Sequence, residues 1–589
     1  MSHVANPAHA WPRRPRTSFS SFTNFAQQHS PFRIPLCRPT TLMAPRRPLI
    51  LALSVTLLTA LVFFFRYGFD DGRHLKNVDK LLHPGPMKPK EPEPTSCTEH
   101  LGWLEPYQFA YPIQYVSRDI IATARADAQR PSLTKMEKPL FEAFTNVDLA
   151  SSQTVKIERC LPPLELAVPH NKLQVVDASN MIFGLQTTMN RLKDTVKHLA
   201  RWLPHTNTHL YAIVIENEEL AADDGDITAL EKQFRDLGID AHIIHPVRPI
   251  DSFAQRYFSL VNIMYAARDD KTQWITLIDD DTFFPSMLDL QNMLKEHDWT
   301  KPQYVGSLSE DWWAVNTYGL MGFGGAGIML SLPMAKIIDD HVDECKENLR
   351  TTAGDISVMD CVYRFSSTKL THIPSLHQVD MHGDLSGFYE SGREMLSLHH
   401  WKEGSAAGYK LEMEKMHLVA DICDSCFLQR WQFPNELLLS NGFSITSYPQ
   451  GHLSGQKPGG VLGTGIQVGE IKKVNLEETE HTWGDDINVL HSLAPVRNKM
   501  DDTMKVGYKL LDSMHVDGGE VGVPGENVVR QVYFKEGGEG EKDTVMVLNW
   551  RSGGEAVVVP ETVTPPEGQE VPGMPKPEKG SRVRRGVKL

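Results

Sequence analysis

Acidic side chains and lysine are absent from the first 47 residues of this 589-residue chain, which carry seven arginines and are rich in proline and serine. Such a segment cannot bury enough apolar surface to fold alone, so we expect residues 1–47 to be disordered. The whole chain nevertheless has a net charge of −14, because the remainder is acidic. No basic patch is rich enough to favour nucleic acid as a partner.

Long uncharged runs are scarce, and the one at residues 48–65 is eighteen residues long, at the short end for crossing a bilayer. A cleaved secretory signal is disfavoured because the run starts late and lacks a small-residue cleavage site. An arginine-rich, acid-free N-terminus is also typical of a mitochondrial presequence. The uncharged run favours a signal anchor, which by the positive-inside rule predicts a single-pass type II Golgi protein with a lumenal body.

Cysteine is also sparse, with seven residues, and the Asn-x-Ser/Thr sequon is absent, so N-glycosylation gives no support to a lumenal location. Cys37 lies in the N-terminal tail, and the other six cysteines permit three disulfides. Cys423 and Cys426 form a C-x-x-C pair, which could be redox-active or half of a zinc site. Without a second such pair, zinc is the weaker interpretation.

Composition and periodicity divide the rest of the chain into segments. We expect a Pro-rich stem (66–96), a poorly periodic lead-in region (97–170), an α/β domain (171–450), a Gly-rich linker (451–469), a β-rich appendage (470–560) and a disordered tail (561–589). Within the appendage, residues 529–534 and 544–550 predict a β-hairpin.

Strand and helix patterns alternate in the α/β domain. Predicted strands at 181–185, 209–215, 241–244 and 274–278 are separated by predicted helices at 190–203, 227–237 and 252–267. A strand at 327–331 and helices at 334–349 and 355–365 follow. This order predicts a parallel sheet covered by helices on both faces, with ligands at the carboxyl ends of its strands.

Three consecutive carboxylates, Asp279, Asp280 and Asp281, follow the fourth predicted strand. They could cap the next helix, since aspartate is a common N-cap residue. Their place at a strand's carboxyl end favours a metal site instead. Mg²⁺ and Mn²⁺ prefer carboxylates together with substrate phosphates, so the acids suggest a metal-bridged diphosphate substrate.

Several motifs together resemble a known family. They are Ile278–Phe284 with its three acids, Phe323–Gly327, Gly354-Asp355, Leu376–Gln378 and Leu396–Trp401. In this order and spacing they resemble the fringe-like branch of glycosyltransferase family 31, especially its fungal type II membrane members, over roughly residues 175–450. The resemblance implies a GT-A fold, which is a Rossmann-like mixed sheet flanked by helices. It also implies a UDP-sugar donor, Mn²⁺ and inversion at the anomeric carbon.

The resemblance also implies roles for single residues. Asp281 would be the main metal ligand and Asp279 the second, with Asp280 touching the donor. Asp355 would be the general base, and Asp360 is the fallback because Gly354 stands where the family often has another acid. Among four nearby histidines, the implied metal ligands are, in order of preference, His377 and His399, ahead of His382 and His400.

Further positions have a plainer alternative beside the implied role. The implied donor or acceptor contacts are Thr187, Trp312, Gly325, Ala326 and Gly327. Thr187 or Thr188 could instead cap a helix, Trp312 and Trp313 could be a buried pair, and the glycines could form a tight turn. Asp384 and Glu390 could bind acceptor hydroxyls or be solvated loop acids, and Cys345 and Cys361 could form a disulfide beside Asp355.

The sequence thus predicts an inverting glycosyltransferase that moves a sugar from a UDP-sugar to a hydroxyl of a glycan or glycoconjugate. It would depend on Mn²⁺, or Mg²⁺, with Asp355 as base. Two alternatives stay open. One is another metal-dependent enzyme acting on nucleotide diphosphates, and the other is a non-catalytic carbohydrate-binding protein of the same fold.

Overall fold

The computed structural model describes residues 95–125, 130–171, 173–218, 220–347, 349, 351–401, 411–455, 472–484 and 491–553. The predicted N-terminal tail, membrane anchor and C-terminal tail, nearly all of the stem and most of the Gly-rich linker lie outside them. All described residues belong to one compact unit, which spans Pro92–Leu589. Within the described part, no helix combines the length and apolar character that crossing a membrane requires.

The first sheet has eight strands in the order β10-β8-β7-β11-β13-β12-β14, with β9 beside β8. Their bounds are β7 Met181–Thr188, β8 His209–Asn217, β9 Leu220–Ala221, β10 Asp240–Ile244, β11 Trp274–Leu277, β12 Tyr304–Gly306, β13 Ile328–Ser331 and β14 Leu370–His372. Strands β10, β8, β7 and β11 are parallel, whereas β13 is antiparallel to both β11 and β12. The sheet is therefore mixed, and the predicted parallel order applies to its first four strands.

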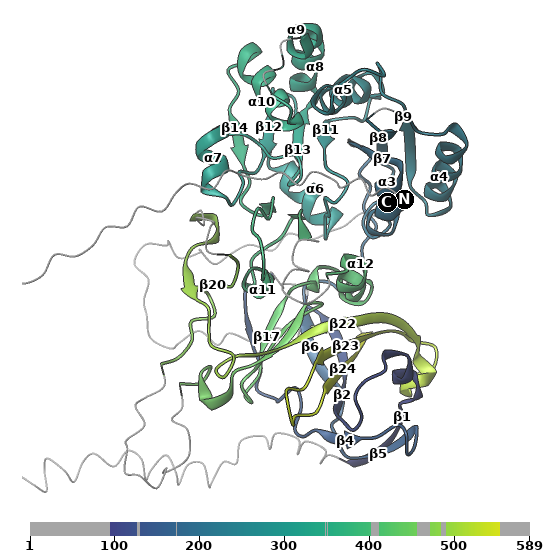
Figure 1. The fold of residues 1–589 in the computed structure, drawn as a ribbon, viewed down its shortest axis with the longest axis vertical. Helices are drawn as coiled ribbons and strands as arrows, with labels where there is room; N and C mark the ends of the chain where they lie inside the picture. Colours follow the sequence, from purple (N-terminus) through teal and green to yellow (C-terminus); the bar gives the residue numbers. More distant parts are fainter. Residues whose placement is uncertain are drawn as a thin grey trace, which may run out of the picture. The chain divides into compact units, whose positions relative to one another are not determined.

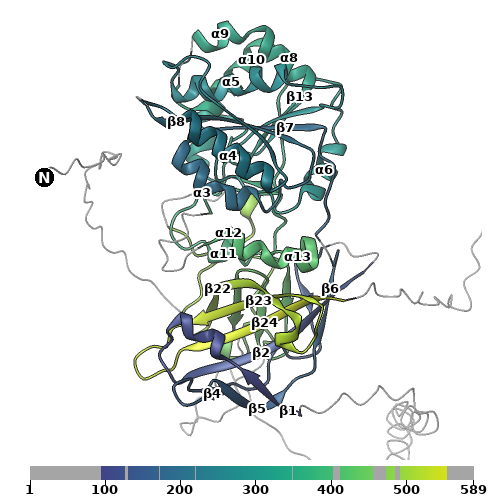
Figure 2. The ribbon, with the colours of Figure 1, turned by 90° about the vertical axis from the view of Figure 1, so that its right-hand side faces the viewer.

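Helices cover both faces of this sheet, as predicted (Figure 2). Helices α3 (Met189–Leu199), α4 (Asp224–Asp236) and α6 (Met287–Lys295) share one apolar core with one face, and α5 (Phe253–Ala266), α8 (Leu332–Asp340) and α10 (Gly354–Phe365) share a second core with the other. The predicted stripe Leu192, Val196 and Leu199 of α3 is buried in the first core. Amphipathic periodicity therefore identified the faces correctly.

The helix predicted at 334–349 is two helices, α8 and α9 (Val342–Glu347). His341 separates them with φ −123° and ψ 22°, outside the helical region. Its ring stacks on Phe365 of α10 with 3.8 Å between ring centroids. Packing between helices therefore interrupts a pattern that local periodicity would continue.

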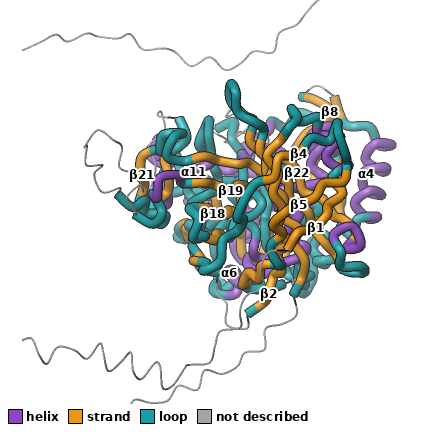
Figure 3. Tube along the Cα trace, turned by 90° about the horizontal axis from the view of Figure 1, so that it is seen from below, coloured by secondary structure: helices purple, strands orange, loops and turns teal. Residues whose placement is uncertain are grey.

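The second sheet has ten strands in the order β3-β17-β18-β19-β22-β23-β24-β2-β4, with β6 also beside β2 (Figure 1). The bounds are β2 Ile113–Ala124, β3 Thr134–Lys135, β4 Thr145–Val147, β6 Leu164–Val168, β17 Arg430–Gln432, β18 Leu437–Ser440, β19 Ser444–Ser447, β22 Val506–Asp517, β23 Asn527–Lys535 and β24 Thr544–Ser552. Figure 3 shows strands, in orange, dominating this part of the chain. The predicted hairpin is confirmed as β23 and β24, which pair antiparallel.

This sheet differs from the predicted division into a lead-in region and a separate appendage. Strand β2, in the predicted lead-in, pairs in parallel with β24 of the predicted appendage, from Gln114 opposite Thr544 to Ala122 opposite Ser552. Strand β19, from the predicted α/β domain, pairs with β22. Both faces of β23 and β24 bury apolar side chains, so these strands are central rather than peripheral.

Short elements complete the described part. They are β1 Thr95–His100, β5 Thr154–Cys160, β15 Leu376–His377, β16 Ser397–Leu398, β20 Thr479–His481, β21 Val496–Asn498, α7 Trp312–Tyr318, α11 Ser386–Tyr389, α12 Met413–Met416, α13 Ala420–Cys423, and 3₁₀ turns at Gly102–Tyr107, His417–Val419, Asp424–Cys426, Pro449–Gly451, His491–Leu493 and Gly518–Val521. Helix α12 contacts both α3 and β22, which connects the two sheets.

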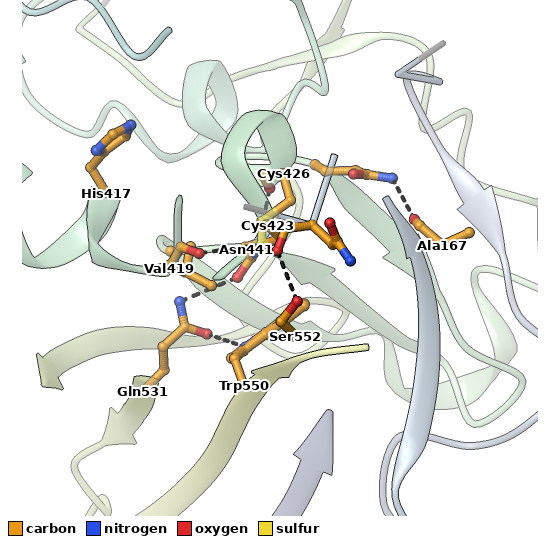
Figure 4. Close-up of a disulfide and its surroundings, with 12 residues drawn as sticks. Ala167, His417, Val419, Cys423, Cys426, Asn441, Gln531, Trp550 and Ser552 are labelled. Atoms are coloured by element: carbon orange, nitrogen blue, oxygen red, sulfur yellow. Dashed lines mark hydrogen bonds between the residues drawn. A yellow bond between two sulfur atoms is a disulfide. The ribbon is translucent and has the colours of Figure 1, made fainter. Parts of the chain in front are cut away.

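Three disulfides lie within the described residues. Cys97–Cys160 joins β1 to β5, and Cys345–Cys361 joins α9 to α10 beside Asp355, the pairing suggested above. The C-x-x-C pair Cys423–Cys426 is closed and buried against the second sheet (Figure 4). Asn441 Nδ2 donates a hydrogen bond to Cys426 Sγ at 3.1 Å. In this state the pair is a structural bridge with no thiolate to offer zinc.

Candidate active site

The three aspartates emerge where the order of the first sheet reverses. Strand β7 has β8 on one side and β11 on the other, so the carboxyl ends of β7 and β11 meet at this point. Pairing continues one residue beyond β11, because Ile278 N donates to Gly184 O at 2.9 Å. The acids follow directly, opposite Thr187 and Thr188. Crevices at such reversal points are the usual ligand sites of open α/β sheets.

Asp280 differs from its two neighbours because its partner is an arginine. It is buried, both of its oxygens accept from the Arg191 guanidinium, and Thr187 Oγ1 donates to it as well. Thr188 caps α3 by accepting from Arg191 N at 3.4 Å. Thr187 therefore orients an acid, and Thr188 is the residue that caps the helix. Asp280 in turn holds Arg191 at the mouth of the crevice.

Asp279 and Asp281 share a different partner, His399. Its Nε2 lies 3.4 Å from Asp279 Oδ2 and 3.0 Å from Asp281 Oδ1. Burial alone would lower the pKa of His399, but the two carboxylates outweigh burial and raise the pKa to about 10. Trp401 Nε1 donates to the Asp281 carbonyl at 2.8 Å and pins the turn. Two carboxylates and one imidazole therefore converge.

His377, the histidine preferred from the sequence, lies elsewhere. It is buried, its Nδ1 lies 3.0 Å from Glu310 Oε1, and its Nε2 lies 3.2 Å from the Glu394 carbonyl. Both ring nitrogens are occupied by these contacts. The structure therefore brings His399, the second choice, to the acids and places His377 between Glu310 and the Glu394 carbonyl. His400 pairs with Asp380 at 3.1 Å.

Asp355 stands at the first turn of α10, half-buried and close enough to Asp279 to sense its charge. Burial, and secondly the charge of Asp279, raise the pKa of Asp355 to about 6. Ile356 N donates to its Oδ1 at 2.9 Å. The fallback Asp360 instead pairs with Arg364 at 3.2 Å on the outer side of the helix. Asp355 is thus the acid of α10 that faces the triplet.

Gly354, the residue before Asp355, lacks a side chain for a reason of packing. A Cβ at this position would lie 2.3 Å from Cγ of Tyr257, so a side chain cannot fit without moving that buried ring. The absence of an acid before Asp355 is therefore a packing requirement of α5 against α10.

The Gly-rich loop before β13 packs directly beneath the acids. A Cβ on Gly325 would lie 2.2 Å from His399 Nδ1, and one on Gly324 would lie 2.2 Å from the Tyr257 hydroxyl. Thr282 Oγ1 donates to Gly325 O at 2.8 Å, and Ala326 N donates to Gln378 at 2.9 Å. Gly327, with φ +98°, completes a turn closed by its N–H on Gly324 O. The loop is a tight turn whose bare backbone makes room for His399.

A cavity of about 380 Å³ opens at this crevice. Its lining residues are Gln186, Thr187, Thr188, Arg191, Ile215, Glu218, Phe253, Arg256, Asp279, Asp280, Asp281, His399 and His400. Of the predicted contacts, Thr187 and the three aspartates belong to this lining. Asp355, Gly325, Ala326, Gly327, Trp312 and His377 stand outside it among the described residues.

Two arginines in the lining were not predicted. In the ion pair between Arg191 and Asp280, the arginine is the exposed partner. Arg256 of α5 is buried. Its Nη2 lies 2.8 Å from Glu218 Oε1, and its Nε donates to Gln186 at 3.1 Å. Guanidinium groups at the carboxyl ends of strands suit phosphate oxygens. Arg191 could have been predicted from the sequence, because it lies in the first helical turn after Thr187 and Thr188. Arg256 could not, because only the packing of α5 brings it to the cavity.

Trp312 and Trp313 are exposed by 50% and 51%, so they are not the buried pair considered above. They begin α7, which Asp311 caps through Trp313 N at 2.9 Å. On its buried side, Ala314 packs near Ile356 and Met359 of α10. The two indoles therefore face outward from a helix that leans on the helix of Asp355.

Comparisons with known proteins cover parts of the chain. A family model described as "Protein of unknown function, DUF604" matches residues 314–421, a range that contains the Gly-rich loop, Asp355, His377 and His399. Over 123 residues, 20% of this chain, the sequence is 26% identical to chondroitin sulfate synthase 3 of Homo sapiens and, equally, of Mus musculus. The match spans 14% of the length of these curated relatives.

Solved structures add only weak likenesses. A mannosyltransferase from Pyrobaculum calidifontis in complex with GDP-Man and Mn²⁺ has a TM-score of 0.25 and 10% identity, covering 35% of this chain and 59% of that one. Mouse xyloside xylosyltransferase 1 has a TM-score of 0.23 and 9% identity, covering 33% and 84%. The segment that matches chondroitin sulfate synthase 3 relates this chain, at a general level, to glycosyltransferases.

Proposed function

We propose that this chain is an inverting glycosyltransferase of GT-A fold that moves a sugar from a UDP-sugar to a hydroxyl of a glycan or glycoconjugate. One observation carries the proposal: Asp279, Asp281, His399 and Asp355 gather where β7 and β11 end. The mixed sheet flanked by helices, and relatives named for synthesis of chondroitin sulfate, support it.

The donor set fits Mn²⁺, or Mg²⁺ as second choice. Asp279 and Asp281 supply carboxylate oxygens, and His399 Nε2 lies within 3.4 Å of both. Carboxylate suits both ions, and imidazole favours the transition metal. We assign the imidazole ligand to His399 in place of His377, because both nitrogens of His377 are already engaged. When bound, the cation neutralises charge that develops on the departing diphosphate.

Arg191 and Arg256 would attract the diphosphate of the donor. Asp280 fixes the Arg191 guanidinium in a two-point pair, and Thr187 fixes Asp280. Asp280 then acts on the donor through Arg191, rather than by the direct contact that the sequence suggested. A planar guanidinium held in this way can meet two phosphate oxygens at once.

Asp355 would take the proton of the acceptor. As the acceptor oxygen forms a bond to the anomeric carbon, the bond from that carbon to UDP breaks and the hydroxyl proton passes to the Asp355 carboxylate. A raised pKa makes this carboxylate a better base than an ordinary aspartate. The exposed indoles of Trp312 and Trp313, on the helix packed beside α10, offer faces on which an acceptor sugar can stack.

We further propose that residues 48–65 anchor the protein in the Golgi membrane as a single-pass type II protein with this site in the lumen. The uncharged run after an arginine-rich tail supports this orientation. A C-terminal fluorescent fusion tests it. Golgi fluorescence with the fusion protected from protease in intact vesicles is expected, and a mitochondrial pattern would reject the proposal.

The activity is tested by screening UDP-sugars against a glycan acceptor mixture, with release of UDP as the readout. The fragment begins at Pro92, because Thr95 starts β1 and Cys97 pairs with Cys160. We expect UDP release that requires Mn²⁺ and is lost in Asp281→Ala and Asp355→Asn variants with unchanged melting temperatures. Release of inorganic phosphate or UMP would favour a diphosphate-cleaving enzyme, and no release with any donor would favour a carbohydrate-binding role.

A further inference from the structure

The amino end of the first sheet holds a second group of metal-ligating side chains. His209 is the first residue of β8 and Asp240 the first of β10, and the two are direct partners in the parallel register. His242 lies two residues after Asp240, so it shares a face of the sheet with Asp240. Strand pairing therefore places two imidazoles and one carboxylate side by side.

The side chains point toward one another. His209 Nδ1 lies 2.7 Å from Asp240 Oδ2, and His242 Nε2 lies 3.6 Å from Asp240 Oδ1. One ligand atom from each of the three residues lies within 4.8 Å of the other two. Tyr211 stacks on the His242 ring at 4.7 Å between centroids and limits its rotation. The carboxylate thus bridges two oriented rings.

We propose that His209, Asp240 and His242 bind a zinc-class divalent ion, with Zn²⁺ as the ion of choice. Tetrahedral Zn²⁺ with bonds of about 2.0–2.1 Å needs ligand atoms about 3.3 Å apart. The two imidazole–carboxylate separations, 2.7 Å and 3.6 Å, lie on either side of this spacing, and the three ligand atoms lie within 4.8 Å of one another, so side-chain rotations can bring them to it. The side chains are 39–54% exposed, which leaves the fourth position to water or to a ligand from another molecule.

The zinc site is separate from the candidate active site. Ile215, near the other end of β8, lines the active-site cavity and lies six positions further along the strand than His209. A strand rises about 3.3 Å per residue, so roughly 20 Å lies between the two ends. An ion held at His209 cannot touch the reacting atoms. Its direct effect would be to join the edge strand β10 to β8.

The ligand chemistry also separates the two sites. Two imidazoles and one carboxylate favour Zn²⁺ or Cu²⁺ over the harder Mg²⁺ and Mn²⁺. The site at Asp279 and Asp281 has two carboxylates and one imidazole. The zinc site should therefore prefer Zn²⁺, and the site at Asp279 and Asp281 should prefer Mn²⁺ or Mg²⁺.

Co²⁺, a spectroscopic substitute for Zn²⁺, tests the zinc site in the full chain carrying Asp281→Ala, which weakens cation binding at the acids. We expect one equivalent of Co²⁺ with the strong visible absorption of tetrahedral coordination, displaced by Zn²⁺. Asp240→Asn and His242→Gln, added separately, should weaken binding about tenfold or more. His245→Gln is the matched control, because His245 pairs with Asp224 at 2.8 Å outside the cluster.

Thermal unfolding supplies a second readout that does not depend on activity. A ligand that binds only the folded state raises the melting temperature, so Zn²⁺ should raise it in the parent and in His245→Gln but not in His242→Gln. Melting temperatures without metal should be alike in all three, which shows that each folds. Equal Co²⁺ binding by the parent and both cluster variants, or no binding by the parent, would overturn the zinc site.

Discussion

At the scale of single residues, Gly325 has no room for a side chain, because the His399 ring occupies the place where its Cβ would lie. We predict that Gly325→Ala displaces that ring from Asp279 and Asp281 and lowers kcat/KM for UDP release about 100-fold, as expected for an ångström-scale misplacement. Gly507→Ala is the control, because its Cβ would meet only the Lys509 side chain at 3.6 Å or more. Wild-type kinetics in Gly325→Ala would show that His399 plays no part.

A second residue-scale prediction concerns Asp355. A base works only when deprotonated, so activity should fall as the pH drops through the pKa of Asp355. That pKa is about 6 without metal, and a cation beside Asp279 would lower it toward the ordinary value near 3.8. The pH profile of kcat/KM should therefore have its acid limb between these values.

Replacing Asp355 with asparagine keeps the shape of the side chain and removes the base. Asp355→Asn should lower kcat/KM by about 10²- to 10⁴-fold and abolish the acid limb. Asp360→Asn is the control and should retain both, because Asp360 lies five residues further along the same helix and pairs with Arg364. An unchanged profile in Asp355→Asn would assign the limb to another group.

The sequence could indicate the acids but could not choose among the histidines. Asp279, Asp280, Asp281 and Asp355 follow predicted strand or helix boundaries, and the structure places all four at one sheet edge. The resemblance put His377 ahead of His399, but the sequence does not show which ring contacts the acids. Only the side-chain partners, Glu310 for His377 and the two aspartates for His399, separate them, and such partners depend on contacts between distant segments.

At the scale of elements, the helix that carries Asp355, α10, is joined to α9 by a disulfide. Cys345–Cys361 closes a loop with a sequence separation of 16, whose loss removes about 3 kcal/mol in the chain-entropy model. We predict that the double variant Cys345→Ser, Cys361→Ser lowers the melting temperature and also lowers kcat, because α10 positions Asp355. The measurement is calorimetry together with UDP release at saturating donor.

The disulfide between β1 and β5 provides the comparison. Cys97→Ser with Cys160→Ser removes a link in the other part of the structure, so it should lower the melting temperature with kcat unchanged at a temperature where the protein stays folded. Equal losses of kcat in the two double variants would mean that the α9–α10 disulfide has no particular role in positioning Asp355.

Helices and strands could be predicted where one of their faces is apolar. They could not be predicted where a contact with another element sets where they end. The alternation from β7 to β11 follows hydrophobic period, and the caps at Thr188, Asp223 and Ser252 mark helix starts. The break at His341 has no such signal, since it arises from stacking on Phe365. A local hydrophobic pattern indicates which face of a helix is buried, but it does not show which neighbouring element interrupts that helix.

At the scale of the described molecule, pairing across more than 400 residues lay beyond the reach of sequence patterns. Strand β2 ends at Ala124 and β24 begins at Thr544, yet they are neighbours in one sheet. The alternation of apolar and polar residues predicted strands at 529–534 and 544–550, but such a pattern does not show which other strand each one pairs with. The result is that the C-terminal segment is an integral part of the fold rather than an appendage.

A buried ion cluster connects this C-terminal segment to the α/β part, and it supplies the last prediction. Glu390, considered above as an acceptor contact, is buried with Lys505 at 2.7 Å and Lys509 at 3.0 Å, and Ser444 donates to it at 2.6 Å. Burial alone would raise the pKa of Glu390, but the two lysines outweigh burial and hold the pKa well below its usual range. Glu390 is therefore a charged structural link between segments distant in sequence.

Removing this charge leaves Lys505 and Lys509, whose side chains are only 11% and 23% exposed, without their shared carboxylate, so Glu390→Gln should destabilise the fold by about 3–5 kcal/mol. The sign of the pH dependence follows from the depressed pKa. The stabilisation is fully present above the unfolded value near 4.5 and is lost as the pH falls below it toward the folded value. The unfolding free energy of the wild type should thus fall more steeply between pH 5 and pH 3 than that of Glu390→Gln. Glu477→Gln, at an exposed site, should follow the wild type, and parallel curves for all three would contradict the cluster's role.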